Sequence, residues 1–263
     1  MKKILLALTA VAAMTASASA ADLASRPYTK APAPLPVAPS WTGFYIFGGG
    51  GGGIWDADTG VQATVGGAPI LGFNQRQGGD GWLGTVGAGY DWQLNQNWVF
   101  GVLADGQFGS LKGTIQDQGP FAAGNIKNDY SWAAGVRLGY LIAPNVLSYV
   151  NAGYTESHWK GTTLFSTITG TPVGLHTNGF DRSGVFVGSG VENNLSFFGI
   201  SAPGWFMKTE YRAAYYDKKN ISELTDVGNL SNGRDITFKP LVQTVTTSLV
   251  YRFNWSGPVV AKY

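Results

Sequence analysis

The stretch from Gly81 to Gln93 reads GWLGTVGAGYDWQ, and its side chains alternate in character from one residue to the next. One parity holds the apolar and aromatic residues Trp82, Val86, Ala88 and Tyr90. The other parity holds the polar residues Thr85, Asp91 and Gln93. Successive side chains of a β-strand point to opposite faces of the sheet, so this pattern predicts a strand with one apolar and one polar face. The stretch is long enough to cross a membrane when tilted.

Seven further segments carry the same period of two, and each could cross a membrane in the same way. Together with Gly81–Gln93 they predict an all-β fold, an eight-stranded antiparallel transmembrane up-and-down β-barrel. The seven segments are Thr42–Ile54, Asn97–Leu111, Asp129–Ile142, Val146–Trp159, Gly179–Glu192, Trp205–Tyr216 and Leu241–Asn254.

The connections between these segments alternate in length. Residues 93–97 and 143–145 form tight turns rich in Asn and Pro, and residues 193–204 form a somewhat longer member of the short set. The other four connections are long and carry many of the charges: residues 56–80, 112–128, 160–178 and 217–240. Short turns on one rim and long loops on the other are typical of an outer-membrane barrel.

The nine tryptophans lie at or near the ends of the predicted strands. Those on the short-turn rim are Trp41, Trp92, Trp98, Trp205 and Trp255, and those on the long-loop rim are Trp55, Trp82, Trp132 and Trp159. Indole rings favour the membrane–water interface, so this placement predicts two interfacial girdles.

The polar parity of the strands predicts which charged residues face the interior. Four acids and four bases fall on that parity: Asp91, Asp105, Glu192 and Glu210 with Arg137, Lys208, Arg212 and Arg252. An eight-stranded barrel is just wide enough for its own side chains, and buried charges must be paired or hydrated. We therefore predict a neutral lumen charge network that plugs the barrel. The alternative is a narrow ion or solute path through the same network.

The ends of the chain differ in composition from the barrel. Residues 1–20 combine Lys2 and Lys3, a short apolar run and a small-residue cleavage site, which indicates a signal peptide. Residues 21–40 form a Pro-rich periplasmic linker, residues 41–255 the barrel, and residues 256–263 a short C-terminal extension. Without the signal peptide the charges balance, and the chain has no Cys, so a nucleic-acid binder and a thiolate site are excluded.

Residues capable of chemistry are few. The only histidines, His158 and His176, belong to no metal-spaced cluster, so we expect no metal or cofactor, although a surface haem or metal ligand stays an alternative. Ser157 lies next to His158 in sequence, but adjacent strand residues point to opposite faces, so we expect no hydrolase dyad and no enzyme. The six consecutive glycines at 48–53 precede no helix, and we interpret them as close-packing strand glycines and not as a phosphate loop.

Several motifs, taken in order, resemble the small alphaproteobacterial outer-membrane β-barrel family, which includes immunogenic outer-membrane proteins, rhizobial outer-membrane proteins and hemin-binding proteins often labelled porins. The motifs are WTGFY at 41–45, GYDWQ at 89–93 with NWVFG at 97–101, GVRLGY at 135–140, KTEYR at 208–212 and YRFNW at 251–255. Leu249, Tyr251 and Phe253 resemble the C-terminal signal that the barrel-assembly machinery reads. Such signals often end the chain at Phe, whereas here Ser256 to Tyr263 follow.

The resemblance and the residue pattern together predict a surface protein of the cell outer membrane. We expect it to contribute to envelope integrity and to surface interaction through four extracellular loops. The alternatives are a small porin with a narrow charged lumen and a hemin-binding protein. The expected partners are outer-membrane lipid and lipopolysaccharide, the barrel-assembly machinery, and a host or surface ligand at the loops, with no nucleic acid.

Overall fold

The computed structural model describes residues 40–70 and 74–253. The predicted signal peptide, the predicted linker up to residue 39, Trp255 and the predicted C-terminal extension lie outside these ranges. Within them, no helix has both the length and the apolar character that a membrane crossing requires.

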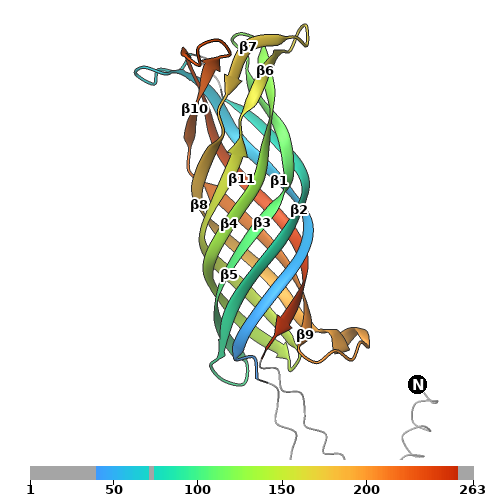
Figure 1. The fold of residues 1–263 in the computed structure, drawn as a ribbon. Coiled ribbons are helices and arrows are strands. Elements are labelled where there is room, and N and C mark those ends of the chain that lie inside the picture. The colour runs from blue at the N-terminus through green and yellow to red at the C-terminus, as the bar shows by residue number, and fades with distance from the viewer. Residues whose placement is uncertain (1–39, 71–73, 254–263) are drawn as a thin grey trace, which may run out of the picture. The chain divides into compact units, whose positions relative to one another are not determined.

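Eight long strands form a closed antiparallel ring, which confirms the predicted fold class (Figure 1). The last strand pairs with the first, from Tyr45 opposite Arg252 to Ala63 opposite Arg234, and this ladder closes the barrel. Around the ring the strands are β1 (Gly43–Ala63), β2 (Gln75–Gln93), β3 (Trp98–Asp117), β4 (Ala122–Ala143), β5 (Val146–Lys160), β8 (Phe180–Asn194), β9 (Trp205–Tyr216) and β11 (Ser231–Arg252).

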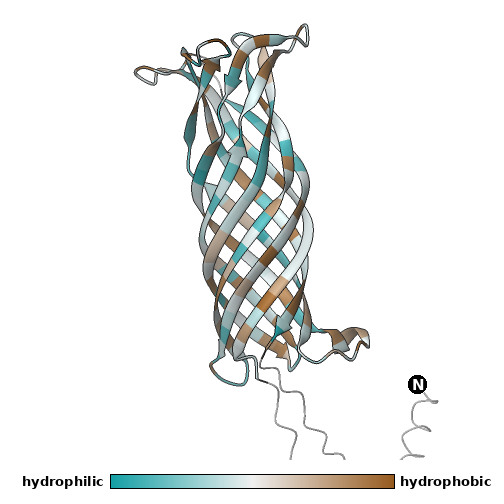
Figure 2. Cartoon of the chain, viewed as in Figure 1, coloured by the Kyte–Doolittle hydropathy of each residue, from teal (hydrophilic) through white to brown (hydrophobic). Residues whose placement is uncertain are grey.

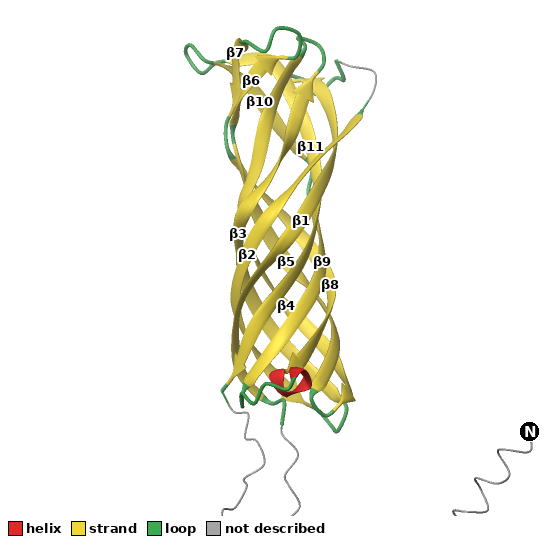
Figure 3. Ribbon diagram, turned by 90° about the vertical axis from the view of Figure 1, so that its right-hand side faces the viewer, coloured by secondary structure: helices red, strands yellow, loops and turns green. Residues whose placement is uncertain are grey.

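The four connections predicted as long loops are largely β-sheet, which corrects the sequence prediction. β1 to β4 and β11 run well past the predicted segments, and three further strands occupy the connections: β6 (Thr162–Ser166), β7 (Pro172–Thr177) and β10 (Lys219–Thr225). β6 pairs with β4 and β7, and β10 pairs with β7 and β11. At this end of the barrel, β6, β7 and β10 therefore take the places of β5, β8 and β9 in the ring (Figures 1 and 3).

Short connections gather at the opposite end, together with the first and last described residues. Between β2 and β3 the Asn95 side chain accepts hydrogen bonds from the backbone N–H groups of Asn97 and Trp98. The longest of these connections contains the 3-10 helix η1 (Leu195–Phe198), red in Figure 3, whose first turn is capped by the Asn194 side chain. Outer-membrane barrels keep such short turns on the periplasmic side.

Glycines on the inner face make room for large side chains from other strands. A Cβ atom at Gly89 would overlap the Tyr45 ring and hydroxyl, one at Gly87 would overlap the Phe47 ring, and one at Gly113 would overlap the Trp55 ring. The aromatic residues lie on β1 and the glycines on β2 and β3. Because an eight-stranded barrel has an interior of side-chain width, these glycines provide the room that the three aromatic rings occupy.

A matched pair of glycines on β2 tests this packing. We expect Gly89→Val to lower the stability of the folded barrel by about 1–3 kcal/mol or to prevent folding, because the side chain overlaps Tyr45. Gly84 faces outward and a Cβ atom there meets no atom closer than 3.7 Å, so Gly84→Val should fold normally. The measurement is the urea midpoint of the form that migrates separately on unheated gels. Equal midpoints for the two variants would contradict the packing described.

Candidate functional site

Aromatic side chains on the outer face of the barrel form two belts. The lower belt, at the short-turn end, is linked by ring contacts such as Trp98 with Tyr140 at 5.2 Å and Trp205 with Tyr251 at 5.1 Å. It consists of Phe44, Tyr90, Trp92, Trp98, Phe100, Tyr140, Trp205, Tyr251 and Phe253. The upper belt consists of Trp82, Phe108, Tyr130, Trp132, Tyr154 and Tyr215, all more than 40% exposed.

The two belts are separated by the length of a membrane-crossing strand. On β2 Trp92 lies ten residues from Trp82, and the same spacing separates Trp205 from Tyr215 on β9. A transmembrane β-strand needs about 9–11 residues, and aromatic girdles flank an apolar band about 25 Å tall. Figure 2 shows hydrophobic residues recurring along this part of the barrel, whereas hydrophilic ones are frequent at the other end.

Three tryptophans predicted for the interfacial girdles are instead inside the barrel. Trp41, Trp55 and Trp159 are each no more than 2% exposed, so an interfacial role for them is wrong. Trp41 and Trp55 share their parity with Tyr45, which points inward, and the glycine run between them concealed that parity in the sequence. Trp82, Trp92, Trp98, Trp132 and Trp205 do face outward, and Trp255 lies outside the described residues.

All eight predicted lumen charges are buried on the inner face, where they form two groups. In the first group, near the short-turn end, the Arg137 guanidinium binds both Asp91 oxygens and reaches Glu192 Oε2 at 3.0 Å. Arg252 Nε donates to Glu192 Oε1 at 2.8 Å, and its Nη2 lies 2.8 Å from Asp91 Oδ2. Two guanidinium groups and two carboxylates thus neutralise each other.

The second group lies deeper in the barrel. Arg212 makes a two-pronged contact with Asp105, at 2.7 and 2.9 Å, and its Nη2 also lies 2.8 Å from Glu210 Oε1. The other Glu210 oxygen accepts from the Tyr149 hydroxyl and the Asn151 amide, and Lys208 Nζ lies 3.8 Å from it. Buried charges that are paired and hydrogen-bonded avoid most of the desolvation penalty, so this arrangement is compatible with a low-dielectric interior.

Aromatic rings also contact three of the buried cations. The Arg252 guanidinium lies 4.4 Å from the Trp41 ring, and that of Arg212 lies 4.4 Å from the Phe186 ring. Lys208 Nζ lies 3.2 Å above the Phe47 ring. These cation–π contacts add attraction that grows when water is excluded.

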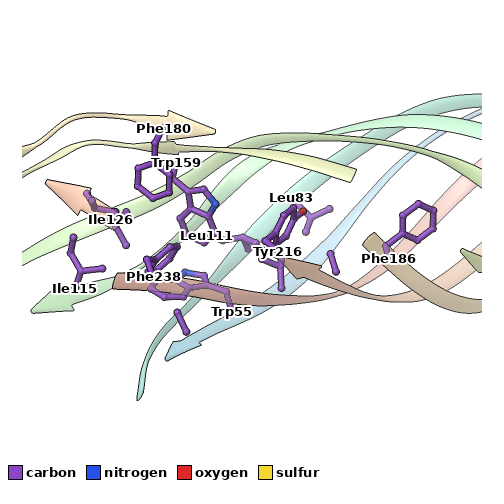
Figure 4. Close-up of a cluster of buried hydrophobic side chains, with 14 of the residues drawn as sticks. Trp55, Leu83, Leu111, Ile115, Ile126, Trp159, Phe180, Phe186, Tyr216 and Phe238 are labelled. Carbon is purple, nitrogen blue, oxygen red and sulfur yellow. The ribbon is translucent and has the colours of Figure 1, made fainter. Parts of the chain in front are cut away.

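Apolar layers lie at both ends of the charge network. Toward the short-turn rim, the floor contains the buried residues Trp41, Val99, Leu141, Leu147, Phe206 and Val250. Toward the other rim, Trp55, Trp159 and Phe238 meet edge to face with ring centroids 5.0 to 5.6 Å apart (Figure 4). Around them pack Ile115, Ile126, Phe180, Ile221 and Ile236, and we call this set the upper plug.

Between the charge network and the upper plug lies a small cavity of about 20 Å³. Its lining includes Gln107, Thr155, Arg212, Tyr216 and Thr244. A cavity of this size holds about one water molecule.

A further polar cluster beyond the upper belt was not predicted from the sequence. The Arg234 guanidinium on β11 donates to both Asp117 carboxylate oxygens on β3, at 2.5 and 2.7 Å. The Asn232 amide donates to Glu223 Oε2 at 2.8 Å. Burial raises the pKa of Glu223 to about 7, to which the neighbouring Asp117 also contributes. Asp117 and Arg234 are far apart in sequence, so only the register of the closed sheet reveals the pair.

The histidines and Ser157 are engaged in local contacts. His158 stacks on Tyr130 at 4.9 Å and lies 2.7 Å from Asp181, whereas Ser157 points inward and accepts from Trp159 Nε1. His176 binds Asp226 and Asn229 at 2.9 Å each. Among the described residues, no group of three potential metal ligands comes together.

The predicted assembly signal lies on the last strand. Leu249 and Phe253 are 51% and 52% exposed on the outer face of the barrel, and Tyr251 contacts Phe253 within the lower belt. Their reading by the assembly machinery stays a prediction.

Comparison with known proteins identifies sequence relatives over nearly the whole chain. No family model matches the chain. The chain is 30% identical to the 31 kDa outer-membrane immunogenic protein of Brucella melitensis biotype 1 and to that of Brucella suis biovar 1, over 272 residues that cover 96% of this chain and all of each relative. Among solved structures it is similar to the outer membrane protein OprG from Pseudomonas aeruginosa, with 12% identity, a TM-score of 0.49, and coverage of 80% of this chain and 97% of that one.

The buried charge network predicts a large cost for removing one partner. We expect Arg212→Met to lower the free energy of unfolding by about 3–5 kcal/mol, because Asp105 would stay buried without its cation. Adding Asp105→Asn should restore part of that loss, since the unpaired charge is then gone. The measurement is urea unfolding in detergent, followed by tryptophan fluorescence.

The matched control for the Arg212 and Asp105 substitutions is the exposed ion pair of Arg76 and Asp56. Arg76 is 69% exposed in its side chain, so Arg76→Met should change stability by no more than about 1 kcal/mol. A similar loss for Arg76→Met and Arg212→Met would show that burial does not govern the energy of the network.

Proposed function

The chain belongs to the family of the 31 kDa outer-membrane immunogenic protein, and on this premise we propose that it is a closed, non-conducting barrel that acts at the cell surface. As in that family, its place is the outer membrane. The barrel anchors the protein and contributes to envelope integrity, and the strand extensions beyond the upper belt present surfaces for interaction. The proposal includes no catalytic activity, in keeping with relatives named for their location and immunogenicity.

The filling of the lumen is the observation that carries the closed-barrel proposal. An ion entering from the long-hairpin end would first meet the upper plug, where Trp55 and Trp159 are each no more than 2% exposed. It would then meet cations and carboxylates already bound to each other at 2.7 to 3.0 Å. A porin instead keeps a water-filled channel, and channels of that kind belong to larger barrels. The geometry therefore favours a plug over the narrow-porin alternative.

The tips of the four long hairpins support a role in surface interaction. Each tip carries at least one exposed apolar side chain: Val65 at 89%, Phe121 at 54%, Ile168 at 74% and Val227 at 89%. Phe121 also has a φ of 54°, a backbone conformation that costs energy for a bulky residue. The exposed apolar side chains at this end of the barrel thus support a contact role for the hairpin tips.

Single-channel recording in a planar bilayer tests the closed lumen. We expect the purified, folded protein to give no conductance steps, and Trp55→Ala to stay silent as well, because the charge network is a second barrier in series. Migration on unheated gels confirms folding, and an open porin in the same membrane is the positive control. Reproducible steps that change with Arg137→Ala would contradict the proposal and establish the narrow-porin function.

Substitution of the tips tests the surface role. We expect the combined variant Val65→Ser, Phe121→Gly, Ile168→Ser and Val227→Ser to reduce adhesion of producing cells to polystyrene and to an epithelial monolayer several-fold. Glycine at 121 accepts the positive φ, so the turn should be retained. Adhesion is counted at equal surface amounts of protein, measured by surface biotinylation.

The matched control removes four exposed apolar residues from the opposite rim: Leu94→Ser, Phe197→Ser, Phe198→Ser and Ile200→Ser. This variant should adhere like the wild type. Both variants should restore detergent resistance to cells that lack the protein, because both keep the barrel. Unchanged adhesion of the tip variant would exclude the tips as the interacting surface.

A further inference from the structure

Three lysines stand side by side on the outer face of neighbouring strands. Lys112 on β3 is directly opposite Lys127 on β4, and Lys127 is directly opposite Lys160 on β5. Like charges directly opposite each other across a ladder are destabilising. The protein therefore carries a row of positive charge that its own fold does not require.

Carboxylates compensate this row only in part. Lys160 Nζ lies 3.2 Å from Asp129 Oδ2. Lys112 and Lys127 form no ion pair within residues 40–70 and 74–253, although Asp80 is the cross-strand neighbour of Lys112 on β2. Lys127, between the other two lysines, is the least exposed of the three. The row thus keeps at least two ammonium groups available to an external anion.

The lysines line a shallow hollow in the outer surface, about 490 Å³ in volume. Its remaining lining is Asn125 and the chain at Gly113 and Gly161, where β5 ends just before β6 begins. No carboxylate lines the hollow. Three ammonium groups and one amide therefore surround a space that can admit an anionic group.

The hollow lies just beyond the membrane band. On β3 Lys112 follows Phe108 of the upper belt by four residues, and on β4 Lys127 precedes Tyr130 by three. For strands tilted by about 40° this places the lysines roughly 8–10 Å beyond the belt. Headgroups occupy the layer immediately outside the hydrocarbon core. The positive row is thus at headgroup height in the outer leaflet.

We infer that Lys112, Lys127 and Lys160 form a binding site for a phosphate group of an anionic outer-leaflet lipid of the lipopolysaccharide type. Lysine ammonium groups bind phosphate as point charges, and the basic row loses its internal repulsion when the anion is present. The site rests on the outer-membrane location of the barrel and is independent of whether the lumen conducts.

Thermal unfolding in lipid vesicles tests the site. The protein is reconstituted in phosphatidylcholine alone, with bisphosphorylated lipid A, with dephosphorylated lipid A, or with inorganic pyrophosphate in the buffer, always with EDTA to remove bridging cations. We expect bisphosphorylated lipid A to raise the midpoint of the wild type by several degrees, and the other additions to leave it unchanged. The combined variant Lys112→Gln, Lys127→Gln and Lys160→Gln should lose this shift.

A second triple variant controls for net charge. Lys218→Gln, Lys219→Gln and Lys239→Gln remove the same charge from β11, from the first residue of β10 and from the residue before it, and this variant should keep the full shift. In phosphatidylcholine alone, the variant that lacks Lys112, Lys127 and Lys160 should unfold at a higher temperature than the wild type, because the repulsion among these three lysines is gone. This comparison also shows that the variant folds.

Several outcomes would overturn the inference. If bisphosphorylated lipid A shifts the midpoint of the Lys112, Lys127 and Lys160 variant as much as that of the wild type, these lysines form no specific site. The same conclusion holds if both triple variants lose the shift equally. An equal shift with dephosphorylated lipid A would exclude phosphate as the bound group. An equal shift with pyrophosphate would assign the site to soluble phosphate and exclude the lipid headgroup.

Discussion

The width of an eight-stranded barrel is the constraint on which the rest of the structure depends. Such a ring encloses a space that its own side chains fill, so several large inward side chains occupy room that glycines leave free. Glycines on β2 and β3 therefore face Tyr45, Phe47 and Trp55 on β1. The same narrowness brings cations and carboxylates from opposite walls within hydrogen-bond distance. Arg137 and Arg212 are therefore each paired with a carboxylate from another strand, which neutralises their charges.

Much of the barrel could be predicted from the sequence because its strands separate two very different environments. Where one parity is apolar and the other charged, as around Arg212, the inward face is evident from the residues alone. β1 lacks this contrast, because Gly48 to Gly53 carry no side chains to compare. Position near a strand end alone therefore places Trp41 and Trp55 in the interfacial girdles, whereas both are buried inside the barrel. Beyond the membrane band the outward face is no longer apolar, and the inward face mixes apolar residues such as Ile115 and Ile236 with charged ones such as Asp117. There the alternation weakens, and the strands appeared as loops.

The members of the charge network could be predicted individually, but not their partners. Parity indicates that Asp105 and Arg212 both face inward, yet their pairing depends on the register and tilt of strands that are not neighbours in the ring. The same holds for Asp117 with Arg234. The lysine row shows the reverse case. Its three residues are ordinary surface lysines in the sequence, and only the ladders β3–β4 and β4–β5 make them adjacent.

The ladder between β1 and β11 also sets the order in which the molecule can be made. β1 is among the first strands to be synthesised, but its partner Arg252 lies at the far end of the described chain. Until that strand arrives, β1 exposes backbone groups that hydrocarbon cannot satisfy, so a partly made chain has no stable place in the bilayer. Arg252 also completes the charge group around Asp91 and Glu192. Closure of the ring and completion of this charge group therefore both depend on β11.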